Sequence, residues 1–114
     1  MIEIPWSDAA ENGLAIAAGN DLHYVKKEVN RGDAKLFYFS PGTYAVMRYE
    51  AEYKEAVLVL GQGENTKKWL PVIEDWALFQ GALTIRTHIT RKGLGRMFGN
   101  AGYTQSEIIM QKVL

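Results

Sequence analysis

The chain has 114 residues, of which 47% are hydrophobic and 23% charged, the balance of a globular protein with one core. We therefore expect a single domain over residues 1–114. The 13 basic and 13 acidic side chains cancel, which argues against a nucleic-acid partner. With no cysteine and only two histidines, a disulfide and a thiolate nucleophile are excluded and a histidine-rich metal site is not expected. The first residues lack the features of a signal peptide and no apolar run approaches the roughly 18 residues of a membrane span, so we expect a cytoplasmic protein without a membrane partner.

The first third of the chain predicts one strand and two helices. Residues 1–5 alternate apolar and polar side chains and stop at a proline, as short edge strands do. Apolar side chains then recur at helical spacing over residues 9–18 and again over residues 21–30. Gly32 is expected to end the second helix.

The next segment predicts three strands in a meander. β-prone stretches at residues 36–39, 44–53 and 56–60 are separated by short turns, so neighbouring strands should pair antiparallel. Val46 and Met47 lie on opposite faces of the middle strand. Both faces of the sheet therefore carry apolar side chains and are expected to be covered.

Helical spacing returns after the meander. A helix is predicted from Asn65 or Thr66 to residue 82, and a proline in its first turns is tolerated there. Its apolar side chains are interpreted as core anchors rather than as a ligand-binding set: Trp69, Val72, Ile73, Trp76 and Phe79. A strand at 83–89, a helix at 91–100 and a closing strand at 106–113 complete the chain.

The predicted order is β-α-α-β-β-β-α-β-α-β, an α/β protein with a mixed sheet. The most specific segment is residues 90–98 (TRKGLGRMF), which follow a strand and lead to Gly102 and Tyr103. This order and this segment resemble the GNAT superfamily of N-acetyltransferases, and in particular small GNAT-like proteins encoded by bacteriophages. The resemblance implies the GNAT acyl-CoA N-acyltransferase fold over nearly the whole chain.

The resemblance also implies acetyl-CoA as cofactor, bound where the meander meets the following helix. Family members hold the pyrophosphate there with backbone N–H groups, because a helix N-terminus offers unpaired donors and the positive end of a dipole. In this chain Asn65 and Lys67 stand where the family has small residues. The positions that the resemblance implies for cofactor binding are Leu60, Gln62, Gly63, Asn65, Thr66, Lys67, Arg91 and Arg96. The alternative is that the loop only turns the chain from strand to helix and that its basic neighbours form a solvated face.

Acyl transfer to an amine needs a base that deprotonates the amine. Many family members also use a tyrosine of the last helix to protonate the leaving thiolate, and the matching residue here is Phe98, which has no proton to donate. His88 shares a strand face with two other polar residues, and this face is either functional or solvated. The candidate catalytic residues are His88, Glu50 and Glu52.

Two functions remain open at this point. The first is an acetyl-CoA-dependent N-acyltransferase that acts on an amine of a small molecule or a protein. The second is a GNAT-like protein that has lost catalysis and serves as a binding or structural component, for instance in a bacteriophage. A homodimer through the closing strand at 106–113 is a further expectation.

Overall fold

The computed structural model describes residues 1–64, 66–88, 94–106 and 110–114. The elements are β1 (Ile2–Ile4), α1 (Asp8–Ala18), a 3-10 turn (Gly19–Asp21), α2 (Leu22–Arg31), β2 (Lys35–Phe39), β3 (Thr43–Glu50), β4 (Glu55–Gln62), α3 (Thr66–Gln80), β5 (Thr84–Thr87) and α4 (Leu94–Asn100). Up to α4 their order is the order predicted from the sequence.

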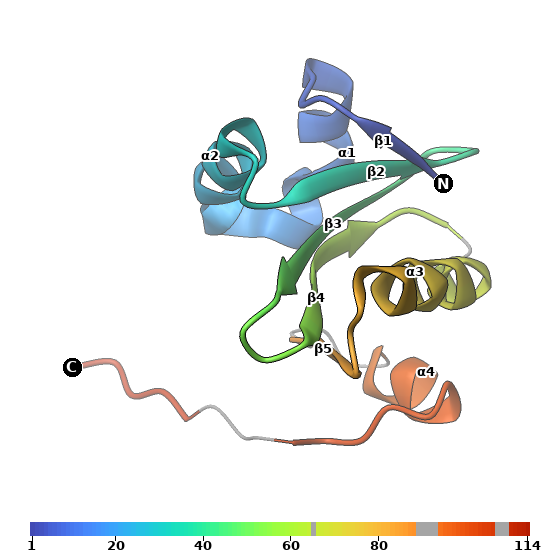
Figure 1. Cartoon of the computed structure of the whole chain (residues 1–114). Helices are drawn as coiled ribbons and strands as arrows, with labels where there is room; N and C mark the ends of the chain where they lie inside the picture. Colours follow the sequence, from blue (N-terminus) through green and yellow to red (C-terminus); the bar gives the residue numbers. More distant parts are fainter. Residues whose placement is uncertain (65, 89–93, 107–109) are drawn as a thin grey trace.

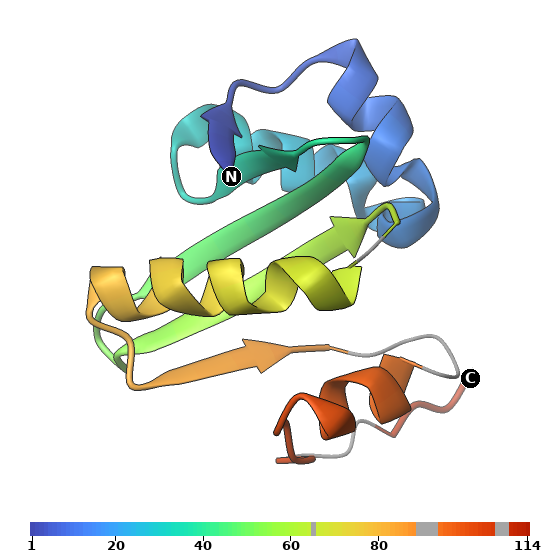
Figure 2. The same ribbon diagram turned by 90° about the vertical axis from the view of Figure 1, so that its right-hand side faces the viewer.

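The strands form one sheet in the order β1-β2-β3-β4-β5 (Figure 1). Neighbouring strands pair antiparallel from β1 to β4, which confirms the predicted meander. Strand β5 pairs parallel to β4. A parallel pair needs a crossover connection, and α3 provides it (Figure 2).

Helices cover both faces of the sheet, as predicted from the alternation along β3 (Figures 1 and 2). Val46 belongs to a core cluster with Leu14 of α1 and Val25 of α2. Its neighbour Met47 points to the opposite face and belongs to a cluster with Ile73 of α3. Because successive strand residues face opposite sides, one strand contributes to both cores.

Local chemistry sets the ends of the first two helices. At the start of α1, the Ser7 hydroxyl oxygen accepts a hydrogen bond from the backbone N–H of Ala10 at 3.2 Å. After α2, Gly32 adopts a φ of 83° and its N–H donates to the carbonyls of Glu28 and Val29. Glycine takes this left-handed conformation at little cost, so α2 ends where the sequence predicted.

One predicted core anchor is wrong. Phe79 is 88% exposed, whereas Leu70, Ile73 and Ala77 are buried. These three residues define the centre of the buried face of α3. At 3.6 residues per turn, Phe79 lies about half a turn away from Leu70, so its ring points to solvent. The two tryptophans of the predicted set do pack against the core.

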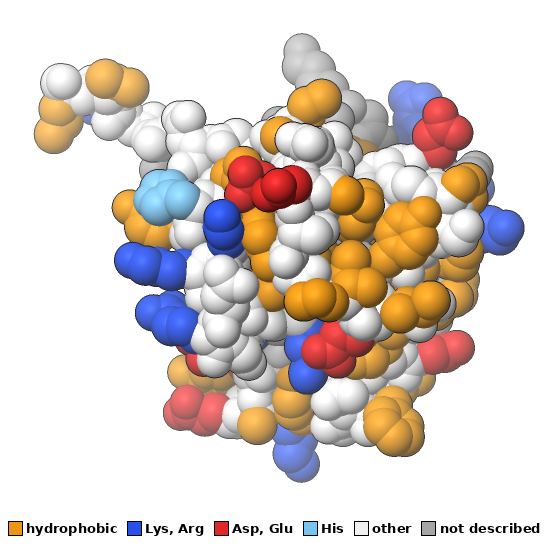
Figure 3. Space-filling view, turned by 90° about the horizontal axis from the view of Figure 1, so that it is seen from above, with side chains coloured by type: hydrophobic (Ala, Val, Ile, Leu, Met, Phe, Trp, Pro, Cys, Tyr) orange, Lys and Arg blue, Asp and Glu red, His pale blue; other side chains and the backbone are white. Residues whose placement is uncertain are grey.

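The predicted closing strand at 106–113 is also wrong for the residues that the structure describes. Residues 103–106 and 110–114 form no strand, and residues 107–109 lie outside the described part of the chain. Met110 and Val113 are 91% and 90% exposed, and the C-terminal residues project away from the body (Figures 1 and 3). A strand is stabilised by hydrogen bonds to a partner and by burial of one face, and the described part of this segment has neither. Strand β5 is consequently an edge of the sheet.

Candidate functional site

Strands β4 and β5 lie together over only half of β4. Their pairing runs from Glu55 opposite Thr84 to Leu58 opposite Thr87, but β4 continues to Gln62. The other edge of β4 stays paired with β3 up to that residue. Among the described residues, no strand pairs with the β5 side of β4 beyond Leu58. The predicted cofactor residue Leu60 is half-buried within this unpaired stretch.

The unpaired stretch leads directly into the predicted cofactor loop. The side-chain oxygen of Gln62 accepts a hydrogen bond from the backbone N–H of Ala17 in α1 at 2.7 Å. The Thr43 hydroxyl donates to the backbone carbonyl of Glu64 at 2.8 Å. The loop is thereby fixed from two sides before α3 begins at Thr66.

Positive charge gathers in the first turn of α3. Lys67 and Lys68 are exposed, and the Lys68 ammonium lies 5.3 Å from the ring centre of Trp69. The indole N–H of Trp69 is buried without a hydrogen-bond partner among the described residues. A helix start with two ammonium groups suits an anionic group, and an unpaired strand edge suits amide groups, so these residues fit a ligand such as coenzyme A. Of the other predicted cofactor residues, Arg96 is exposed on α4, while Asn65, Arg91 and the side chain of Thr66 lie outside the described part.

Two candidate bases lie at the opposite end of β4. Glu50 ends β3, and Glu52 is exposed in the turn before β4. Seven residue steps separate the start of β4 from Gln62, a distance of roughly 23 Å at 3.3 Å per residue. The Glu50 carboxylate also accepts from Arg48 at 3.0 Å and from Arg86 at 3.3 Å. The structure therefore separates both glutamates from the loop and engages Glu50 in ion pairs.

The third candidate base lies closer to the gap between the strands. His88 follows Thr87, the last residue of β5 that pairs with β4, and it is exposed. It lines a cleft of about 1010 Å³ that runs along β5 and α4 and includes the segment up to Ser106. The structure thus brings His88, rather than the two glutamates, to the side of the sheet where β4 and β5 part.

The same cleft contains a tyrosine pair that the sequence did not predict. The Tyr103 hydroxyl donates to the carboxylate of Glu74 in α3 at 2.8 Å. Burial raises the pKa of Tyr103 above its ordinary range, and the hydrogen bond and negative charge of Glu74 raise it further. Phe98, at the family's tyrosine position, is 5% exposed and packs edge-on against the Tyr103 ring. No local signal marks Glu74 as a partner, because the two residues are 29 positions apart.

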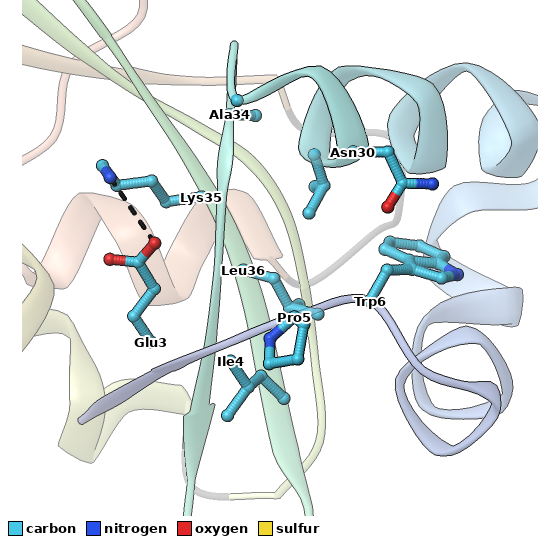
Figure 4. A pocket seen from close by; sticks show the side chains of 10 residues that line it. Glu3, Ile4, Pro5, Trp6, Asn30, Ala34, Lys35 and Leu36 are labelled. Carbon is cyan, nitrogen blue, oxygen red and sulfur yellow. Dashed lines mark hydrogen bonds and ion pairs between the residues drawn. The ribbon is translucent and has the colours of Figure 1, made fainter.

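A second cleft of about 540 Å³ lies between β1, the end of α2 and the start of β2 (Figure 4). Trp6 and Asn30 point toward each other on one side, and Lys35 pairs with Glu3 at 3.5 Å on the other (Figure 4). It contains none of the predicted site residues.

Within the described ranges, no group of three His, Cys, Asp or Glu side chains could hold a metal ion. In those ranges no helix is long and apolar enough to cross a membrane. On the face seen in Figure 3, basic and acidic side chains are interspersed.

No family model and no curated protein matches the chain. Solved structures do match. A protein described as a probable acetyltransferase aligns with 100% of this chain and 97% of its own at a TM-score of 0.64 and 8% identity. The ribosomal-protein-alanine N-acetyltransferase from Brucella melitensis biovar Abortus 2308 covers 99% and 97% at 0.57 and 13% identity. The protein TTHA1254 from Thermus thermophilus covers 100% and 97% at 0.56 and 15% identity. At these identities the likeness concerns the fold, and over its full length the chain has the fold of GNAT acetyltransferases.

Proposed function

We propose that this protein is an acyl-CoA-dependent N-acyltransferase. The observation that carries the proposal is the parting of β4 from β5 beyond Leu58, at the same end of β4 where α3 begins with two lysines. Coenzyme A has a negatively charged pyrophosphate at one end of an amide-containing arm. The helix start and its lysines match the first, and the unpaired strand edge matches the second.

The chain's own residues would then have separate tasks. Residues 59–62 orient the amide-containing arm by backbone hydrogen bonds, and Lys67 and Lys68 balance the phosphate charge. The coenzyme supplies an acyl thioester when bound. The His88 imidazole, at the parting of the strands, accepts the proton that the acceptor amine loses. Positioning of the two reactants carries most of the rate, because a side chain that could protonate the thiolate is absent at Phe98.

The second candidate function is a GNAT-like binding protein without catalysis. The burial of Phe98 in the core favours it, since phenylalanine cannot act as an acid and cannot move without disturbing the packing. The nature of the amine, a homodimer and a link to bacteriophages remain predictions.

The test is titration of the protein with acetyl-CoA, followed by heat release and by melting temperature. Ligand at one hundred times its dissociation constant stabilises the folded state by about 2.7 kcal/mol, so binding raises the melting temperature. If neither signal changes, both the enzyme and the site proposed at the α3 start are wrong. If acetyl-CoA binds, a thiol-release assay with a panel of small-molecule and peptide amines separates the enzyme from the binding protein, and His88→Gln should lower turnover without weakening acetyl-CoA binding.

A further inference from the structure

We propose that Thr43 is a positioning residue for the loop before α3, and that Gln62 anchors the same loop to α1 through its side chain instead of contacting the ligand. The inference deepens the proposed function, because it rests on a coenzyme A site at this loop. It assigns both side chains an indirect role, in which they act on ligand binding through the loop backbone.

Thr43 is a buried polar residue at the first position of β3. It is 3% exposed, and its hydroxyl donates to the carbonyl of Glu64 at 2.8 Å. A buried hydroxyl and a carbonyl that lose each other have no water to replace the bond. The bond therefore holds the loop backbone in one orientation immediately before the helix.

Gly63 brings the loop against Thr43 more closely than another residue would allow. Its φ is 141°, and a Cβ at this position would collide with both the backbone and the side chain of Thr43. Thr43 consequently contacts two successive loop residues, Gly63 by packing and Glu64 by its hydroxyl. Together these contacts set the direction in which the chain enters α3.

Gln62 fixes the loop from the side of α1. Its side-chain oxygen accepts from the backbone N–H of Ala17 at 2.7 Å, and its backbone pairs in register with Tyr44 of β3. On α1, Gly13 lies so close to the Tyr44 ring that a Cβ would collide with it. Helix α1 thus lies directly against β3 beside the loop. With its oxygen bonded to α1, the Gln62 side chain serves the loop's position.

A loop held from both sides presents the N–H groups of the first α3 turn in a fixed arrangement. A ligand that binds there loses less affinity to ordering the loop, which is the benefit of preorganisation. Removing the Thr43 hydroxyl should release the loop while leaving each proposed ligand contact in the sequence.

The experiment compares Thr43→Val, which keeps the shape but loses the hydroxyl, with Thr43→Ser, which keeps the hydroxyl. Ser7→Ala is the matched control, because it also removes one side-chain to backbone hydrogen bond, but at the far end of α1. Calorimetry with coenzyme A gives the dissociation constant, and amide hydrogen exchange reports on the backbone at 62–68. We expect Thr43→Val to raise the dissociation constant roughly tenfold, the factor that 1.4 kcal/mol represents, and to speed exchange at 62–68. Thr43→Ser should lie near the wild type, and Ser7→Ala should lower the melting temperature without changing either reading.

Unchanged exchange at 62–68 in Thr43→Val overturns the positioning role, and so does an unchanged dissociation constant. An equal loss of affinity in Ser7→Ala also overturns it, since general destabilisation would then explain the effect. If the wild-type protein gives no heat with coenzyme A, the proposed function fails by itself. Exchange then still decides whether Thr43 holds the loop.

Discussion

A guanidinium nitrogen of Arg86 on β5 lies 3.3 Å from a carboxylate oxygen of Glu50 on β3, so this ion pair reaches across the whole width of β4. The same oxygen lies 3.0 Å from Arg48, and the second terminal nitrogen of Arg86 lies 3.2 Å from Glu55 of β4. The Arg86 and Glu50 side chains are 32% and 25% exposed, so solvent screens these pairs only in part. Strand β5 has four residues, and the network fastens this short edge strand to its two neighbours.

Replacing Arg86 by methionine should lower the free energy of unfolding by about 1–2 kcal/mol, because two half-buried carboxylates lose a charged donor. Lys35→Met is the control, since its pair with Glu3 is exposed and should contribute about 0–1 kcal/mol. Urea unfolding of both variants measures the difference. Equal losses would show that the network does not hold β5.

The raised pKa of Tyr103 predicts a pH dependence at the alkaline end. The unfolded tyrosine ionises near pH 10, whereas the folded one keeps its proton to higher pH. The folded state therefore binds more protons than the unfolded state above about pH 10, and its stability falls as pH rises. The contribution is complete below the unfolded pKa and is lost through the folded pKa.

Tyr103→Phe should remove this part of the alkaline decline, which denaturant unfolding between about pH 8 and 11 would reveal. Ultraviolet titration should also show one tyrosine fewer that ionises late. Tyr24→Phe is the control, since this side chain is 59% exposed. Identical pH profiles for Tyr103→Phe and the wild type would contradict the prediction.

The exposure of Phe79 predicts that its replacement by serine is tolerated. The change should alter the free energy of unfolding by no more than about 0.5 kcal/mol, as for other surface positions. Ile73→Ala on the buried side of α3 should cost about 2–5 kcal/mol. Thermal or urea unfolding compares them. A large loss in Phe79→Ser would restore the core role predicted from the sequence.

The close approach of Gly63 to Thr43 predicts that alanine is not tolerated in the loop. Gly63→Ala should cost about 1–3 kcal/mol from backbone strain, with the collision added. Gly99 is within α4 with open space around its Cβ position, so Gly99→Ala should stabilise the protein by about 0.5–1 kcal/mol. Opposite signs in urea unfolding are the expected result, and a loss of stability in both variants would contradict it.

Much of the fold could be predicted because its signals are local. Gly32 ends α2 through its own backbone conformation, and the alternation of Val46 and Met47 shows that both sheet faces are covered. The closing strand could not be predicted in the same way. Its β-prone residues are necessary for a strand, but a strand also needs a partner, and residues 110–114 have none among the described residues.

The candidate site was predictable only in part. The resemblance placed a loop between a strand and a helix at Gln62, and the structure has the loop there. It did not indicate that the Gln62 side chain bonds to Ala17, 45 positions earlier. The grouping of Glu50 and Glu52 with His88 was a list of suitable side chains, and the structure separates the two glutamates from the loop by the length of β4.

By itself the sequence determined the order of the elements up to α4, because apolar spacing and turn residues act over a few neighbouring positions. The tertiary structure decided which residues meet: Arg86 with Glu50 across 36 positions, and Thr43 with Glu64 across 21. It also decided that Phe79 faces solvent, since the packing of α3 chooses the buried side of a helix that is apolar on several. Such contacts depend on how the chain closes over many residues, and local spacing carries no record of that closure.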